Sequence, residues 1–331
     1  MKRQTMFFFS ILLILLLFNN INLIAQSSGY KVTGSIDIGG EGRWDYLSVD
    51  TTMHRLYISH ATKVHVIDLT DNIVLGEIAG LHGVHGIAIV PKSGKGFISN
   101  GQDNSITVFD INTLKVLDSV KIPGKKPDAI VYEPFSNRVF AFNGGSANAT
   151  AIDGSTGKIV GSVKLDGNPE FATSDEKGGM YVNLEEENAI ELFNPLTLKV
   201  TAKWSIEPCK GPSGLAIDLI NNKLFSTGSN RLLAVVDTKT GKVITLPIGG
   251  RVDGCAVDQT WHYAFSSNGD GTMTVIKEES PDKIVVVDNI QTIQGARTIT
   301  IDQSTHKIYS LAMLDKGKDK KSFGVLIIEK K

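Results

Sequence analysis

The sequence predicts an all-β protein: a seven-bladed β-propeller in which each blade has four antiparallel strands and an N-terminal strand closes the ring in the last blade. Three observations lead to this prediction. One pattern of short strands occurs seven times, its copies follow one another without a linker, and the two ends of the chain supply complementary parts of one blade. Repeats of about 40 to 45 residues made of short strands are typical of propeller blades.

The repeat is clearest in residues 42–60. There Asp45 opens an alternation of apolar and polar residues, which indicates a strand with one buried face, and Tyr57 follows a turn within a second strand. The opening polar residue recurs at intervals of 40 to 44 residues. The aromatic position is filled in every copy, by Tyr57, Phe97, Phe140, Tyr181, Phe225, Phe265 and Tyr309.

The ends of the chain predict how the ring closes. The last repeat has three strands, at 297–302, 307–311 and 325–329, and no fourth strand follows them. Residues 31–38 precede the first repeat and have the alternation of a fourth strand. We therefore expect 31–38 to pair with 325–329, so that the first and last blades leave no open sheet edge between them.

The first 25 residues have the features of a signal peptide. Lys2 and Arg3 precede an apolar run at 7–18, and Ala25 stands before the polar Gln26. A charged segment, an apolar segment and a small residue in this order are typical of export signals. The apolar run is shorter than the ~20 residues that a membrane span needs. We expect cleavage after Ala25, a periplasmic or secreted protein and no membrane span after processing; an uncleaved membrane anchor is the alternative.

Charge and cysteine content narrow the class of partner. The formal net charge is −1, and it becomes −3 without the two basic residues of the predicted signal peptide. A nearly neutral protein lacks the basic surface that nucleic-acid binding requires, so we expect no nucleic-acid partner. We expect a monomer that binds a polar small molecule, a glycan or a protein. Cys209 and Cys255 could pair in an oxidising compartment, but we expect two unpaired buried thiols.

Three of the second strands carry a family resemblance. The tetrads at 57–60 (YISH), 97–100 (FISN) and 181–184 (YVNL) match a pattern of an aromatic, an apolar and a polar residue. In this pattern, though not letter for letter, the chain resembles the YVTN-type seven-bladed β-propellers, named for Tyr-Val-Thr-Asn. The resemblance covers essentially all of 30–331 and implies a single propeller domain. Such propellers serve as surface proteins, binding modules and enzyme scaffolds, so it implies no one activity.

The predicted topology brings polar residues to one face of the ring. The loops that enter the innermost strands and the loops that leave the second strands share this face, at the mouth of the central channel. The polar residues that open the repeats ring that mouth, and residues of the adjoining loops join them. The predicted ligand-binding residues are Asp45, His85, Asp128, Glu170, Asp253, Arg297, Trp44, His60, Asn100, Asn143 and Arg251. We assign no catalytic residue, no metal ligand and no cofactor.

Some of these residues have a simpler interpretation. An Asp at the start of an inner strand often caps the backbone of the preceding loop. This alternative applies to Asp45, Asp128 and Asp253. The residues that break the repetition of Asp, and so carry more of the site prediction, are His85, Glu170 and Arg297.

Three histidines fall on the opposite face. His54, His262 and His306 occupy one repeat position, three residues before the aromatic, where the other repeats have Gly or Asn. Gly, Asn and His share a tolerance of positive φ in turns. We therefore interpret these histidines as turn residues rather than as a metal cluster.

Two classes of function remain open. We favour a non-catalytic binding module or scaffold that recognises a polar ligand, a glycan or a partner protein at the channel mouth, because the sequence has no nucleophile motif and no closed metal motif. The alternative is an enzyme, a lactonase-like hydrolase or a lyase, as in other propellers with a polar channel mouth. In it His85 or Glu170 would be the base, and Arg297 would hold a carboxylate or an oxyanion. A cation bound by Asp45, Asn100 and Asn143 would favour the enzyme.

Overall fold

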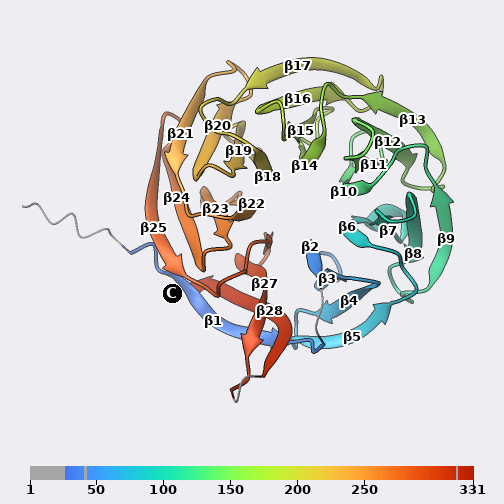
Figure 1. Cartoon of the computed structure of the whole chain (residues 1–331), viewed down its shortest axis with the longest axis horizontal. Helices are drawn as coiled ribbons and strands as arrows, with labels where there is room; N and C mark the ends of the chain where they lie inside the picture. The colour runs from blue at the N-terminus through green and yellow to red at the C-terminus, as the bar shows by residue number, and fades with distance from the viewer. Residues whose placement is uncertain (1–26, 41–42, 318–319) are drawn as a thin grey trace, which may run out of the picture.

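The computed structural model describes residues 27–40, 43–317 and 320–331. These residues form seven four-stranded antiparallel sheets arranged in a ring (Figure 1), which confirms the predicted seven-bladed propeller. The one helical segment among the described residues is the 3-10 turn η1 (Pro91–Ser93). Within the described ranges we find no helix long and apolar enough to cross a membrane. The predicted signal peptide, residues 1–25, lies outside them.

Each blade contributes one strand to each of four concentric positions. The innermost strands are β2 (Trp44–Asp50), β6 (Val84–Val90), β10 (Pro127–Glu133), β14 (Pro169–Ser174), β18 (Pro212–Asp218), β22 (Val252–Asp258) and β26 (Ile299–Asp302). The second strands are β3 (Arg55–His60), β7 (Lys95–Asn100), β11 (Arg138–Asn143), β15 (Met180–Leu184), β19 (Lys223–Gly228), β23 (Tyr263–Asn268) and β27 (Lys307–Asp315). The third strands are β4 (Lys63–Asp68), β8 (Ser105–Asp110), β12 (Asn148–Asp153), β16 (Ala189–Asn194), β20 (Leu232–Asp237), β24 (Thr272–Ser280) and β28 (Lys321–Lys330). The outermost strands are β5 (Ile73–Ile78), β9 (Val116–Lys121), β13 (Ile159–Lys164), β17 (Lys199–Ser205), β21 (Val243–Pro247), β25 (Lys283–Gln291) and β1 (Tyr30–Asp37).

The N-terminal strand closes the ring as predicted. β1 pairs antiparallel with β28 at the outer edge of blade 7, with Lys31 opposite Glu329 and Ile36 opposite Val325. The hairpin of this blade is longer than the sequence pattern indicated. β27 and β28 remain paired as far as Asp315 and Lys321, beyond the predicted ends of both strands.

The apolar core lies between neighbouring blades. All seven second-strand aromatics are buried, none more than 5% exposed. One cluster packs Tyr57 of blade 1 against Val84 of blade 2, and another packs Leu56 of blade 1 against Tyr309 of blade 7. Since each blade buries its apolar faces against the next, every blade depends on its neighbours. Cys209 and Cys255 are buried and unpaired, as predicted.

The turns between the first and second strands also follow the sequence prediction. The Asp50 carboxylate accepts hydrogen bonds from the backbone N–H groups of Thr52 and Met53, at 2.9 and 3.1 Å. His54, His262 and His306 have φ values of 52°, 54° and 59°. The Gly and Asn residues at the same position of the other blades also have positive φ, so backbone geometry explains this column of residues.

Backbone hydrogen bonds join the two sets of loops at the channel mouth. The carbonyl of Arg43 accepts the N–H of Ala61 at 2.9 Å, and the carbonyl of Arg251 accepts the N–H of Gly269 at 3.0 Å. Both carbonyls belong to the residue two positions before the polar residue that opens a blade. In these two blades the loop that enters the innermost strand is thereby fixed to the loop that leaves the second strand, and this holds the site residues in place.

Candidate functional site at the channel mouth

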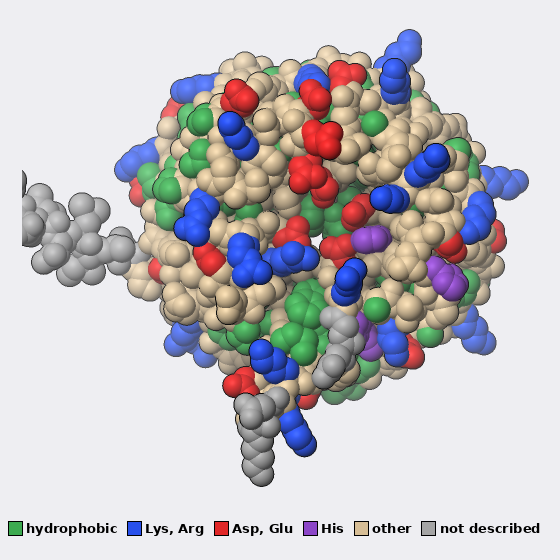
Figure 2. All heavy atoms as spheres, in the orientation of Figure 1, with side chains coloured by type: hydrophobic (Ala, Val, Ile, Leu, Met, Phe, Trp, Pro, Cys, Tyr) green, Lys and Arg blue, Asp and Glu red, His purple; other side chains and the backbone are tan. Residues whose placement is uncertain are grey.

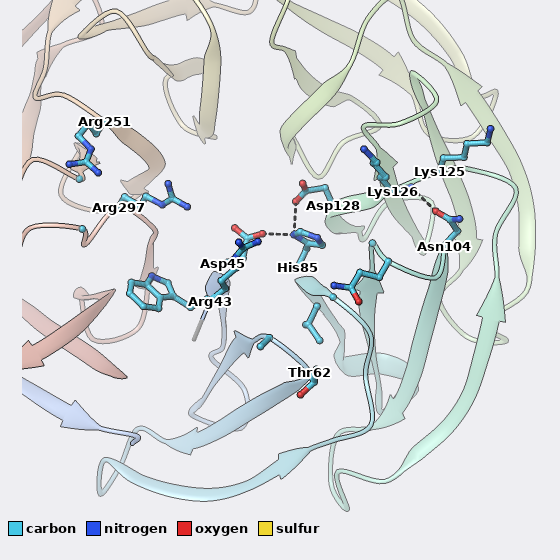
Figure 3. A pocket seen from close by; sticks show the side chains of 18 residues that line it. Arg43, Asp45, Thr62, His85, Asn104, Lys125, Lys126, Asp128, Arg251 and Arg297 are labelled. Atoms are coloured by element: carbon cyan, nitrogen blue, oxygen red, sulfur yellow. Dashed lines mark hydrogen bonds and ion pairs between the residues drawn. The ribbon is translucent and has the colours of Figure 1, made fainter. Parts of the chain in front are cut away.

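Three polar side chains from consecutive blades meet at the channel mouth (Figure 3). His85 Nδ1 lies 2.5 Å from Asp45 Oδ2 and 3.6 Å from Asp128 Oδ1. Each residue lies on its blade's innermost strand, β2, β6 or β10, so the ring geometry alone brings them together. One imidazole thus faces two carboxylates.

An arginine approaches the same point from the last blade. Arg297 Nε lies 3.1 Å from Asp253 Oδ2, and Ser213 Oγ donates to the other carboxylate oxygen of Asp253 at 3.1 Å. The guanidinium extends towards Asp45 and His85 (Figure 3). Polar contacts therefore join blades 5, 6 and 7 at the mouth.

At two places in this polar ring, a serine of the preceding blade fixes the backbone. Ser99 Oγ of blade 2 donates to the carbonyl of Asp128 in blade 3 at 2.5 Å. Ser267 Oγ of blade 6 likewise donates to the carbonyl of Arg297 in blade 7. Because these hydroxyls are buried in second strands, they position the site residues from beneath without entering the site.

The polar ring opens into a pocket of about 1180 Å³ with a basic rim. Asp45 and Asp128 are the carboxylates that line it. The basic side chains that line it are Arg43, Lys125, Lys126, Arg251 and Arg297. Figure 2 shows acidic side chains gathered on one side of the central opening, and Lys and Arg on the other. The mouth is therefore electrically polarised.

Two of the basic residues occupy strained backbone positions. Lys126 and Arg251 have φ values of 52° and 59°. In blades 2, 5 and 7 the same position is filled by glycines, Gly83, Gly211 and Gly295, which also have positive φ. A left-handed conformation costs a residue with a Cβ roughly 1 kcal/mol. Blades 3 and 6 thus have a Lys and an Arg at the pocket, at a position where glycine would be less strained. Sequence reasoning missed this signal, although the interrupted column of glycines is visible in the repeats.

Two carboxyl groups on the acidic side of the mouth have raised pKa values. Burial raises the pKa of Glu170 to about 8, and the charges of Asp128, Glu185 and Asp253 add to the shift. Burial also raises the pKa of Asp128 to about 6, together with the charge of Asp45. Such groups can donate or accept a proton at the pH at which proteins work.

Opposing effects act on His85 and Asp253. Burial lowers the pKa of His85, but the hydrogen bond to Asp45 and the charge of Asp128 outweigh it, so the pKa is raised. Burial raises the pKa of Asp253 to about 6 even though the charge of Arg297 opposes the shift. Glu170 and Asp253 are not among the residues that line the pocket.

Two aromatic rings stack further down the channel. Tyr46 of blade 1 and Phe171 of blade 4 have ring centroids 4.5 Å apart. Both line a second cavity of about 230 Å³ between the innermost strands. A hydrogen bond from Tyr46 to Asp128 lowers the pKa of that carboxyl group. Tyr46 thereby connects the aromatic pair to the polar ring above.

Besides Glu170 and Asp253, three predicted site residues do not line the pocket. His60 is 7% exposed, lies 3.0 Å from His65 through ring nitrogens, and packs on Phe323. Asn100 and Asn143 are buried as well. All three end second strands, as predicted, but their side chains turn back into the sheet.

The two asparagines hold the neighbouring third strands. The Asn100 amide donates to Thr107 Oγ1 at 2.9 Å, and the Asn143 amide donates to Thr150 Oγ1 at 3.0 Å. The cation site considered from the sequence, Asp45 with these two asparagines, therefore does not assemble. The oxygen and nitrogen ligands that do lie together are those of Asp45, His85 and Asp128, all within 4.8 Å of one another.

The other six predicted residues lie at the pocket. Asp45, His85, Asp128, Trp44, Arg251 and Arg297 line it. Trp44 also stacks on Phe323 with ring centroids 5.2 Å apart, which fixes one wall. Sequence reasoning did not single out the lysines at 125 and 126 as ligand-binding residues.

Comparison with known proteins supports the fold. No protein-family model matches the chain, and no curated protein matches it in sequence. Among solved structures, the chain is similar to hydrazine synthase of Kuenenia stuttgartiensis, with a TM-score of 0.73 and 16% sequence identity, over 84% of this chain and 96% of that chain. At this identity the similarity shows a shared propeller fold and gives no information about activity.

Proposed function

We propose that the protein is a binding module whose channel-mouth pocket takes a polar small molecule with an anionic group. The observation that carries this proposal is the basic rim: five Lys and Arg side chains line a pocket of about 1180 Å³. Guanidinium groups bind carboxylates and phosphates through paired hydrogen bonds. Two members of the rim also keep a strained backbone, which is the kind of cost found at functional sites.

The floor of the pocket suits hydroxyl groups. Asp45 and Asp128 accept hydrogen bonds, and His85 lies between them. A sugar acid or a sugar phosphate carries both parts, an anion for the rim and hydroxyls for the floor. The pocket slightly exceeds the ~300–1,000 Å³ of typical small-molecule sites, so it has room for more than one sugar ring.

An enzyme is the second candidate, and one observation favours it. His85 is hydrogen-bonded to Asp45, while the nearby Glu170 has a pKa raised to about 8 by burial and neighbouring carboxylates. A base beside a protonated acid is the arrangement that a lactonase-like hydrolase or a lyase would use, with Arg297 on the substrate carboxylate. Asp45, His85 and Asp128 also offer the ligand types that a divalent cation accepts.

The biological setting is part of the proposal. Export with cleavage after Ala25 is supported by the charged, apolar and small-residue order of the first 25 residues. Mass spectrometry of the mature protein would contradict it by finding Met1 at the N-terminus. Membership of the YVTN-type propellers is supported by the second-strand pattern, and we propose a monomer.

A panel of matched ligands tests the proposal. Glucuronate, galacturonate and glucose 6-phosphate are titrated by calorimetry, each beside its neutral parent sugar, and the reaction mixtures are analysed for products. We expect at least one acid to bind and its neutral partner to bind at least tenfold more weakly. Conversion of a bound acid would favour the enzyme. Equal binding of acids and neutral sugars, or binding of neither, would contradict an anion site.

A further inference from the structure

Four polar side chains converge on the opposite face of the ring, between blades 5 and 6. Asp218 ends β18, and Asn221 lies in the turn that follows it. His262 lies in the equivalent turn of blade 6, and Glu278 is on β24. None of these residues belongs to the channel-mouth site.

The polar atoms of this cluster lie at similar distances from one another. Asp218 Oδ2 lies 3.2 Å from His262 Nδ1. Asn221 Nδ2 lies 3.1 Å from Asp218 Oδ2, 3.3 Å from Glu278 Oε2 and 3.4 Å from His262 Nδ1. A tetrahedral site with metal–ligand bonds of about 2.0–2.1 Å has edges of about 3.3 Å. Rotation of the Asn221 amide would present its oxygen in place of its nitrogen.

The cluster has more acceptors than donors. Asp218 is fully buried and Glu278 is 4% exposed, yet Glu278 Oε1 has no hydrogen-bond partner. The nearby Lys223 pairs with Asp237 at 2.5 Å. Buried carboxylates with a spare oxygen are normally paired with a cation or hold a metal.

We propose that Asp218, His262 and Glu278 bind one divalent transition-metal ion, Zn²⁺ in the first instance, with Asn221 available as a fourth ligand. One imidazole and two carboxylates are a ligand set that Zn²⁺ accepts. Asp218 belongs to blade 5, and His262 and Glu278 to blade 6. The ion therefore clamps two neighbouring blades together.

Other blade junctions of the same protein provide an internal comparison. His306 Nδ1 lies 2.8 Å from Asp258 Oδ2 between blades 6 and 7, which repeats the His262–Asp218 contact. Strand pairing places Lys330 of β28 where blade 6 has Glu278. The turn geometry thus explains the His–Asp contact but does not explain the buried glutamate. Of the two junctions compared, only that of blades 5 and 6 has the third ligand.

The test measures Zn²⁺ binding to the mature, chelator-treated protein by calorimetry. All variants carry His85→Ala, which removes the possible Zn²⁺ ligand at the channel mouth. Glu278→Gln and His262→Gly remove two ligands, and glycine suits this turn because Gly94 and Gly178 fill it in blades 2 and 4. His306→Gly is the matched control. We expect one Zn²⁺ per chain, a loss of affinity of roughly tenfold or more in each ligand variant, and no change in the control.

Crystals soaked in Zn²⁺ then locate the ion by anomalous scattering. A peak between Asp218, His262 and Glu278 supports the site. The proposal is overturned if the His85→Ala protein binds no Zn²⁺, if Glu278→Gln and His262→Gly bind it as well as their parent, or if the only peak lies elsewhere.

Discussion

At the scale of single residues, Lys126 and Arg251 show that placing cations at the pocket strains the backbone and lowers the stability of the fold. Both hold left-handed backbone conformations at a position where three other blades have glycine. The backbone of Lys126 is kept there by a hydrogen bond from its N–H to Asn104 Oδ1 at 2.8 Å. Strain that neighbouring structure maintains is evidence for a role of the side chain.

Replacing either residue with glycine should change stability and anion binding in opposite directions. We expect Lys126→Gly and Arg251→Gly to raise the free energy of unfolding by up to about 1 kcal/mol, because glycine adopts positive φ without strain, and to weaken anion binding. Urea unfolding and calorimetry measure the two quantities. Lys125→Gly is the control, since Lys125 lines the pocket without a positive φ and should lose affinity without gaining stability. A drop in stability in Lys126→Gly would contradict the strain argument.

Glu170 predicts a pH dependence of stability. Its pKa of about 8 in the folded protein exceeds the ordinary value of about 4.3 expected in the unfolded chain. Between these values the folded state binds more protons than the unfolded state, so the free energy of unfolding falls as pH rises through this range. The contribution is fully present below about pH 4.3 and is lost by pH 8.

The measurement is urea unfolding at several pH values from 5 to 8.5. Glu170→Gln should reduce the fall in stability with pH, because glutamine does not titrate. Glu186→Gln, a change at an exposed residue on the same side of the ring, should leave the fall unchanged. Identical pH profiles for Glu170→Gln and the unaltered protein would show that Glu170 titrates normally.

For single residues, the sequence predicted backbone conformation better than it predicted side-chain contacts. The positive φ of His54, His262 and His306 followed from the Gly and Asn residues that share their column. The burial of Asn100 and Asn143 did not follow, because the partners that turn them inward are threonines on a different strand. The cluster of Asp218 with Glu278 could not be predicted either, since it joins two blades and Glu278 lies near the end of a third strand.

At the scale of elements, the closing strand β1 joins the two ends of the propeller. It buries Tyr30 and Ile36 in the packing around blade 7. The repeat length and the strand patterns were sufficient to predict this closure. The extra length of the β27–β28 hairpin was not predicted, because pairing beyond Leu311 depends on cross-strand partners such as Met313 and Phe323 rather than on the repeat.

Removal of β1 tests the closure. A chain that lacks residues 27–40 should unfold at a lower temperature and over a broader range, because β28 loses its partner strand and adjacent blades support each other. Within the intact chain, Ile36→Ala should cost about 2–4 kcal/mol, whereas Val32→Ala, at a residue that is 37% exposed, should cost under about 0.5 kcal/mol. Unchanged melting of the shortened chain would show that the ring does not need its closing strand.

At the scale of the whole molecule, the two faces of the ring carry different sets of side chains. One face carries the polarised mouth and the basic pocket (Figure 2). The other carries the tight turns between first and second strands, together with the proposed metal site. The ring topology predicted which loops share a face, and hence that polar residues of several blades gather at the channel mouth. It could not predict the chemistry of the ligand, because that depends on side-chain directions that the repeat does not encode.

The affinity of the best-bound acid for three single variants tests the central claim most directly. Arg297→Ala and His85→Ala remove groups at the mouth, and His306→Gly changes the opposite face while keeping the turn. We expect the first two to bind about tenfold more weakly or worse, since a hydrogen bond to a charged group contributes about 1.5–3 kcal/mol. Arg297 is 55% exposed, so its loss should leave folding nearly intact. His306→Gly should bind like the unaltered protein. Equal weakening by His306→Gly, or full affinity in both mouth variants, would contradict a ligand site at the channel mouth.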